Sequence, residues 1–330
     1  MRIFIAPIII SVIALGAIYL WGGIAAFALA LLLSILEVTL SFDNAVVNAK
    51  VLARMDDKWQ KRFLTWGILV AVFGTRLVLP AFIVAIAAGI APWVAFTLAI
   101  ENPEEYGRVL SESAHVIGSF GGAFLLMVSL KYFFNVSKHV HWIAMIEKYL
   151  ARWGRIEAIE IAIALTTILS LSYLSHEPQG PILAAGVIGV VLFLIIQGIA
   201  NSLDVEAGQI EKTGAVLFVY LNFLDAAFSL DGVIGAFALT TAIPIIFVGL
   251  GIGAYFVRSI TVYLVRKKTL EALLYLEHGA HWAILGLAMS MLVGLLIHVP
   301  EVITGLIGLV FVSLAYMSSR RAILNRVPSA

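Results

Sequence analysis

The feature that most constrains this chain is a series of apolar runs, each long enough to cross a lipid bilayer. A transmembrane helix needs about 20 mainly apolar residues to cross roughly 30 Å of hydrocarbon. Because lipid offers the backbone no hydrogen-bond partners, such runs fold as helices. The runs predict an all-α fold, a polytopic transmembrane helical bundle of about ten spans. The predicted spans are residues 3–21, 23–48, 63–90, 111–134, 156–174, 181–199, 213–238, 244–264, 272–297 and 300–318.

One of these runs has an irregular sequence. Residues 63–90 are long for a single span and contain Pro80, which predicts a kink. The apolar stretch 91–100 that follows is too short to cross a bilayer. We therefore expect it to form a re-entrant or interfacial segment.

Composition supports lipid as the solvent of this chain. Hydrophobic residues make up 62% of it and charged residues only 12%, whereas soluble domains have roughly 25% charged residues. A net charge of +1 without a dense basic stripe excludes nucleic acid as a partner. The chain has no cysteine, so disulfides and thiolate metal sites are also excluded. Any bound metal must meet oxygen or imidazole ligands.

The connections between spans alternate in charge, which predicts the orientation of the chain. Basic connections are residues 49–62, 135–155 and 265–271, together with the C-terminal tail. Acidic or neutral connections are residues 101–108, 175–181, 240–244 and 298–301. Cytoplasmic loops carry the excess of Lys and Arg. We predict a multi-pass protein of the plasma membrane (the inner membrane of a bacterium), with both termini cytoplasmic.

An acidic motif occurs twice within the apolar runs. The segment LEVTLSFDNAV, from Leu36, aligns with LDAAFSLDGVI, from Leu224. The alignment places Glu37 over Asp225 and Asp43 over Asp231, with the same spacing between the two acids. Downstream, Gly67 precedes Arg76 by nine residues, and Gly249 precedes Arg258 by nine residues. Further on, His115 aligns with His281. Matches in the same order indicate an internal repeat.

The span count gives the two copies opposite directions through the membrane, so we predict two inverted three-helix repeats. The basic segment after Asp43 and the uncharged segment after Asp231 agree with this. Inverted repeats are a common architecture of secondary transporters. The predicted organisation is a first span (1–22), repeat 1 (23–134), a cytoplasmic loop with two connecting spans (135–210), repeat 2 (211–297), and a last span with a basic tail (298–330).

The intramembrane acids need a partner or a polar cavity. A charged side chain at the bilayer centre costs about 2.5–3.5 kcal/mol, so Glu37 and Asp225 are not expected to face lipid. On an ideal helix Asp43 and Asp231 lie about 120° from the face of the first acids. We hypothesise that local unwinding at 41–44 and 229–232 turns them back and frees carbonyl oxygens for a cation. Such oxygen ligands suit a hard or borderline divalent ion.

Arginine and histidine residues add two open questions. Arg76 and Arg258 are candidate counter-charges that either lock the bundle through ion pairs or compete with a cation for the acids. His115 and His281, with His278, are candidate additional ligands or proton carriers. The alternatives for these histidines are packing between helices or a position at the membrane interface.

These segments resemble the TerC-like integral membrane family, named for tellurium resistance, within the wider group of lysine-exporter-type transporters. The resemblance rests on residues 40–47 (LSFDNAVV), 66–76 (WGILVAVFGTR), 122–133 (GAFLLMVSLKYF) and 228–238 (FSLDGVIGAFA). It implies a divalent metal-cation transporter, with manganese(II) efflux as the usual activity. The ligand positions that it implies are Glu37, Asp43, Asn44, Asp225 and Asp231.

The sequence thus predicts a secondary transporter of divalent cations that works by alternating access, with proton coupling as a further hypothesis. Its predicted partners are a divalent metal ion, as substrate, and the lipid bilayer, and a homo-oligomer is compatible with the sequence. We predict no enzymatic activity and no resident cofactor, because HExxH and GxSxG motifs are absent. An intramembrane metalloenzyme and a non-transporting stress-response partner are the alternatives.

Overall fold

A computed structural model describes residues 2–205, 210–267, 273–297 and 299–324 of the protein. Every regular element in these residues is a helix, as predicted. Within the described residues, six helices are long and apolar enough to cross a membrane, which supports a polytopic membrane protein. They are α1 (Arg2–Leu40), α7 (Ala114–Phe133), α10 (Gln179–Val205), α11 (Ile210–Leu239), α12 (Ile243–Arg266) and α15 (Glu301–Leu324).

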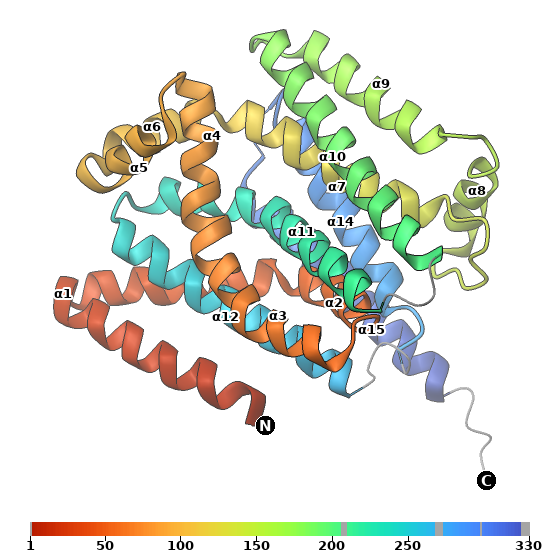
Figure 1. Ribbon diagram of the computed structural model, residues 1–330, viewed down its shortest axis with the longest axis horizontal. Helices are drawn as coiled ribbons and strands as arrows, with labels where there is room; N and C mark the ends of the chain where they lie inside the picture. Colours follow the sequence, from red (N-terminus) through yellow and green to blue (C-terminus); the bar gives the residue numbers. More distant parts are fainter. Residues whose placement is uncertain (1, 206–209, 268–272, 298, 325–330) are drawn as a thin grey trace.

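Shorter helices complete the described bundle. The helices α5 (Pro92–Glu101) and α9 (Ile159–Leu174) are apolar but shorter than a typical span. The segment predicted to be re-entrant or interfacial is therefore a separate helix, α5, which lies beside α6 (Pro103–Glu112) at one end of the bundle (Figure 1). Two further helices are α8 (Ala144–Trp153) and α14 (Leu276–Val293).

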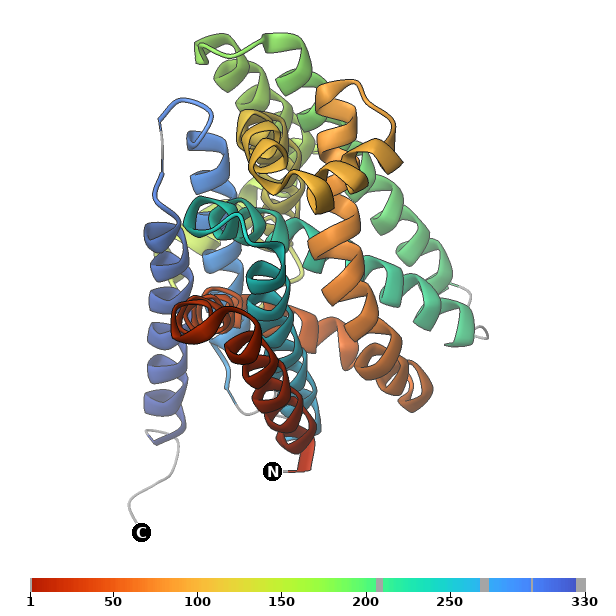
Figure 2. The ribbon, with the colours of Figure 1, turned by 90° about the vertical axis from the view of Figure 1, so that its left-hand side faces the viewer.

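The first long helix, α1, is divided by a sharp corner at Gly23. This residue has φ 71° and ψ −164°, a conformation that favours glycine because it has no Cβ. Two straight arms meet at the corner, as Figures 1 and 2 show. The break lies between the first two predicted spans, 3–21 and 23–48. The second arm leads directly into the first acidic motif.

The acidic motifs differ in backbone structure. Helix α1 ends at Leu40, Ser41 has φ −99° and ψ 16°, and α2 runs from Phe42 to Leu52. The unwinding predicted at 41–44 is therefore confined to one residue. In the second motif the prediction is wrong, because α11 continues without a break through residues 229–232. A continuous helix keeps its backbone hydrogen bonds internal, which a lipid environment favours.

The helix irregularity near Pro80 begins before the proline itself. Helix α3 (Asp57–Leu69) continues into the π-helical segment η1 (Val70–Val78), and α4 (Leu79–Ala88) begins just before the proline. The irregular geometry thus starts about ten residues before Pro80. Single-turn π segments within helices are frequent at functional sites. Here the π segment carries Arg76.

Three apolar clusters form the core of the described residues, and α11 contributes to each of them. Leu224 and Phe228 belong to a cluster with α2, α7, α10 and α14. Val233 and Ala236 belong to a second cluster with α1, α5, α6 and α12. Residues 229–232 of α11 therefore lie between the first and the second of these clusters.

Basic connections gather at one end of the bundle. In Figure 1 the α2–α3 connection, α8 and the end of α15 lie toward the right, whereas the corner of α1, α5 and α6 lie at the left. The start of α1 and the end of α15 lie at the same end of the molecule in Figure 2. This segregation of charge is the pattern on which the predicted orientation rests.

Candidate functional site

A buried ion pair joins the two charged residues predicted in repeat 1. Glu37, on the second arm of α1, pairs through Oε1 with Nη2 of Arg76 on η1. Both side chains are buried. Ser41 donates a hydrogen bond of 3.1 Å to the same Glu37 oxygen. Arg76 also donates to the carbonyl of Ala71 at 2.6 Å and to the hydroxyl of Thr75 at 3.2 Å.

The corresponding residues of repeat 2 form a second buried ion pair. Asp225 on α11 and Arg258 on α12 approach to 3.1 Å, and both are buried. Arg258 further donates to the side chain of Asn222 at 3.3 Å and to the carbonyl of Phe63 at 3.4 Å. Its guanidinium lies 4.3 Å from the centre of the Phe63 ring. Each acid thus pairs with the arginine that follows it in its own repeat.

The two pairs are connected across the repeats in a reciprocal way. Asn44 of the first motif donates a hydrogen bond of 2.9 Å to Asp225. Gly232, which aligns with Asn44, faces Glu37, since a Cβ on this glycine would lie 3.1 Å from Glu37 Oε2. Each motif therefore has one residue that lies against the acid at the start of the other motif.

The close fit around Glu37 depends on glycine. A Cβ added to Gly253 on α12 would overlap the Cβ and Cγ atoms of Glu37. Because Gly253 has no side chain, the side chain of Glu37 can pack directly against α12. This explains in part why α1 and α12 pack along one another.

Several buried polar atoms near the two pairs have no hydrogen-bond partner within the described residues. They are Oδ1 of Asn44, both amide atoms of Asn48, Oγ of Ser229, and Nε of Arg76 and Arg258. Asn48 is fully buried, and Asn44 and Ser229 are 2% and 3% exposed. Leaving such groups unpaired costs roughly 1–3 kcal/mol each. Three of these residues offer oxygen atoms, so the site has unused capacity to bind a ligand.

The remaining predicted ligands lie outside the described side chains. The backbone of Asp43 and of Asp231 is helical, but their side chains lie outside the described part of the structure. Among the described residues, no group of three or more His, Asp or Glu side chains is arranged to hold a metal ion. Of the four predicted acids, Glu37 and Asp225 are the two whose contacts are described.

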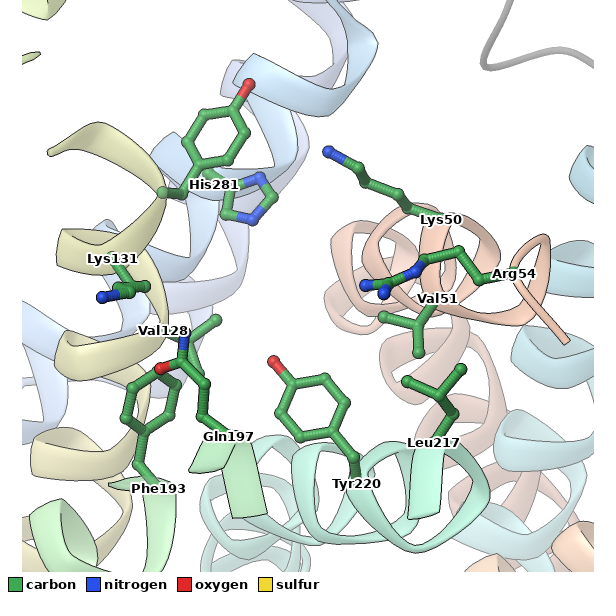
Figure 3. A pocket seen from close by; sticks show the side chains of 11 residues that line it. Lys50, Val51, Arg54, Val128, Lys131, Phe193, Gln197, Leu217, Tyr220 and His281 are labelled. Atoms are coloured by element: carbon green, nitrogen blue, oxygen red, sulfur yellow. The ribbon is translucent and has the colours of Figure 1, made fainter. Parts of the chain in front are cut away.

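The predicted histidines lie at other places in the fold. His115, at the start of α7, has Nδ1 at 3.9 Å from Glu177. His281 on α14 hydrogen-bonds through Nδ1 to the carbonyl of Glu277 at 2.9 Å and stacks on Tyr132, with ring centroids 3.6 Å apart. Figure 3 shows that it faces a cavity across from Lys50 and Tyr220.

This cavity has a cationic lining. It has a volume of about 220 Å³ and lies between α2, α7, α10, α11 and α14. Its charged lining residues, among those described, are Lys50, Arg54 and Lys131. Lys50 forms an ion pair with Glu277, and Lys131 is paired with Glu160 at 2.9 Å. The surroundings of His281 are thus basic, unlike the acid-containing site at Glu37 and Asp225.

One buried acid was missed by the sequence analysis. Glu147 on α8 is 1% exposed and accepts hydrogen bonds from His278 at 2.7 Å and Trp282 at 3.1 Å. Lys138 lies 3.2 Å from the same carboxylate. Burial alone would raise the pKa of Glu147, but the hydrogen bond and charge of His278 and the charge of Lys138 lower it to about 2. The sequence feature that could have pointed to Glu147 is that it is the single acid in the basic stretch 135–155.

Comparison with known families gives a match over most of the chain. A family model described as a protein of unknown function, DUF475, matches residues 42–327. The chain belongs to the DUF475 family. The matched part of this DUF475 protein contains Asn44, Arg76, Asp225 and Arg258, and Glu37 lies just before it. No curated protein and no solved structure matches the chain.

Proposed function

We propose that this DUF475 protein is a secondary transporter of divalent metal cations. The observation that carries the proposal is the reciprocal arrangement of two buried acid–arginine pairs, in which Asn44 contacts Asp225 and Gly232 faces Glu37. Ionisable residues inside a membrane are costly and usually mark a pathway for ions or substrates. A purely structural lock needs only one such pair, whereas alternating access requires equivalent elements in both halves.

The two halves are proposed to be inverted repeats. The aligned positions Asn44 and Gly232 each lie against the acid of the other motif, which supports a pseudo-two-fold axis between the halves. We further propose about ten spans, with the two arms of α1 crossing separately and with α9 and α14 among the crossings. In this arrangement the basic end of the bundle and both termini face the cytoplasm. The proposed membrane is the plasma membrane.

The proposed transport cycle exchanges arginine for a cation. In the described arrangement each arginine neutralises the acid of its own repeat, which lowers the cost of keeping both charges out of water. An incoming divalent ion would displace the guanidinium groups and bind carboxylate oxygens of Glu37 and Asp225. The unpaired oxygens of Asn44 and Ser229 could complete its shell. Release of the ion lets the arginines return.

The nature of the donors favours a hard or borderline ion. Carboxylate, amide and hydroxyl oxygens suit magnesium, calcium and manganese, and the chain offers no thiolate. The resemblance to TerC-like proteins favours manganese(II), exported from the cytoplasm, as the substrate. Proton coupling is proposed because carboxylates that release a cation can take up a proton.

A flux assay tests the proposal. The purified protein is reconstituted into liposomes, and uptake of manganese, calcium, zinc and magnesium is measured with and without a pH gradient. We expect manganese flux, which Glu37→Gln and Asp225→Asn abolish. Glu104→Gln, in an exposed acid at the start of α6, is the matched control and should transport normally. Full transport by both site variants would contradict the proposal.

A further inference from the structure

The short helix α8 exposes apolar side chains along one face. Met145, Tyr149 and Trp153 follow one another at intervals of four residues, so they form a single stripe on the helix. Their exposed fractions are 85%, 56% and 40%. The rings of Tyr149 and Trp153 lie 5.7 Å apart within this stripe. Tyr and Trp are the residues enriched where hydrocarbon meets water.

The opposite face of α8 is fixed to the protein by an acid. Glu147 accepts hydrogen bonds from Trp282 and from the backbone nitrogen of Trp142, and it is paired with His278. This is the reverse of an ordinary surface helix, which buries its apolar residues and exposes its charges. The apolar stripe of α8 is therefore directed away from the protein by specific polar contacts.

Cations border the apolar stripe. Lys148 and Arg152 are exposed, and at 100° per residue both lie next to the stripe on the side away from Leu150. Arg155 follows directly after the helix and is also exposed. Such a combination of an apolar face with Lys and Arg beside it is typical of helices that lie in the plane of a membrane surface.

The fold places the C-terminal end of α8 next to the end of α7 and the start of the apolar helix α9. Five residues separate Trp153 from the apolar helix α9, so the two ends lie within about 20 Å of one another even for an extended chain. The turn between them contacts the end of α7, because a Cβ on Gly154 would overlap the carbonyl of Phe134. The end of α7 and the start of α9 are joined by the 2.9 Å ion pair of Lys131 and Glu160.

We propose that α8 is a membrane-surface helix that binds anionic phospholipid headgroups through Lys148, Arg152 and Arg155, with Met145, Tyr149 and Trp153 inserted at the headgroup boundary. The basic side of the bundle is the side on which anionic lipids attract such residues. Each cation near an anionic surface strengthens binding by about fivefold. The helix then anchors the loop between α7 and α9 independently of the transported substrate.

The absence of cysteine from the chain allows a direct test. An environment-sensitive fluorophore is attached to Met145→Cys, and in a second variant to Tyr149→Cys, in nanodiscs of phosphatidylcholine with or without phosphatidylglycerol. The matched control is His139→Cys, an exposed position of the same loop that lies outside α8. We expect emission shifted to shorter wavelength at 145 and 149, more strongly with phosphatidylglycerol, and a water-like spectrum at 139.

Replacement of the three cations completes the experiment. The variant Lys148→Gln/Arg152→Gln/Arg155→Gln should remove the difference between the two lipids and leave the elution profile of the protein unchanged. Water-like emission from α8 in both lipids would overturn the proposal. An emission shift of equal size in both lipids would also overturn the proposal. In that case, cross-linking of two copies through residue 145 would show that the apolar face of α8 binds a second molecule of this chain.

Discussion

Asn44 on α2 donates a hydrogen bond of 2.9 Å to Asp225 on α11, so a residue of one acidic motif holds the acid of the other. This bond joins residues 181 positions apart in the sequence. It makes the two motifs parts of one site, and it places an amide oxygen without a partner beside a buried carboxylate.

The first prediction concerns this bond. Replacing Asn44 by Ala should lower the free energy of unfolding by about 1–3 kcal/mol, because the buried Asp225 carboxylate loses a donor. Thermal unfolding in detergent would measure the change. In a double-mutant cycle with Asp225→Asn, the two effects should not be additive. Additive losses would mean that the two side chains do not interact in the folded protein.

The second prediction concerns the buried ion pairs. Arg258→Gln alone should destabilise the protein by about 3–5 kcal/mol, because it leaves the charge of Asp225 buried and unpaired. The double variant Arg258→Gln/Asp225→Asn should recover a large part of this loss. The control is Arg108→Gln, whose pairs with Glu105 and Glu112 are exposed and screened by solvent, so their loss should change stability little. Equal losses in the single and double variants would contradict the pairing.

The sequence was sufficient to predict the helical fold and the residues that form the two ion pairs. Spacing alone relates Glu37 and Arg76 to Asp225 and Arg258, since the same order of residues occurs twice. Spacing could not decide whether the arginines contact the acids, because that depends on how α1 lies against η1 and α11 against α12. The described pairs agree with the counter-charge prediction, and competition with a cation remains a proposal.

Other features depend on tertiary contacts that no local pattern encodes. Two similar motifs give a break at Ser41 but a continuous helix through Ser229, since packing around each motif differs. Glu147 has the sequence context of a solvated loop acid, and only the fold brings His278 and Trp282 to it from 131 and 135 residues away. The charge pattern distinguishes Glu147 as the single acid of a basic stretch, but it does not predict that the side chain is buried.

The third prediction concerns the packing of Glu37. Gly253→Ala should destabilise the protein by about 1–3 kcal/mol and impair cation flux, because the new Cβ would displace Glu37 from its place against α12. Gly16→Ala is the matched control, since nothing lies within 4 Å of a Cβ at that position and alanine favours a helix. Thermal unfolding and liposome flux are compared for both variants. Wild-type behaviour of Gly253→Ala would show that Glu37 does not occupy this place.

The fourth prediction concerns the pH dependence of the contacts that hold α8. The pKa of Glu147 is lowered from 4.5 to about 2, so its ionised form stabilises the folded state above pH 4.5, and this contribution is lost as the pH falls toward 2. Glu147→Gln should therefore destabilise the docking of α8 by a few kcal/mol near pH 7, with a difference from the wild type that shrinks between about pH 5 and pH 2.

Hydrogen exchange of the backbone amides of α8, measured for both proteins over this pH range and corrected for intrinsic rates, would follow the effect. The amides of α7 serve as the internal control, because α7 is buried along most of its length and should exchange equally slowly in both proteins. A difference in α8 that stays constant from pH 7 to pH 2 would mean that the charge of Glu147 does not hold the helix. A difference that disappears as the carboxylate is protonated would assign the stabilisation to its contacts with His278 and Lys138.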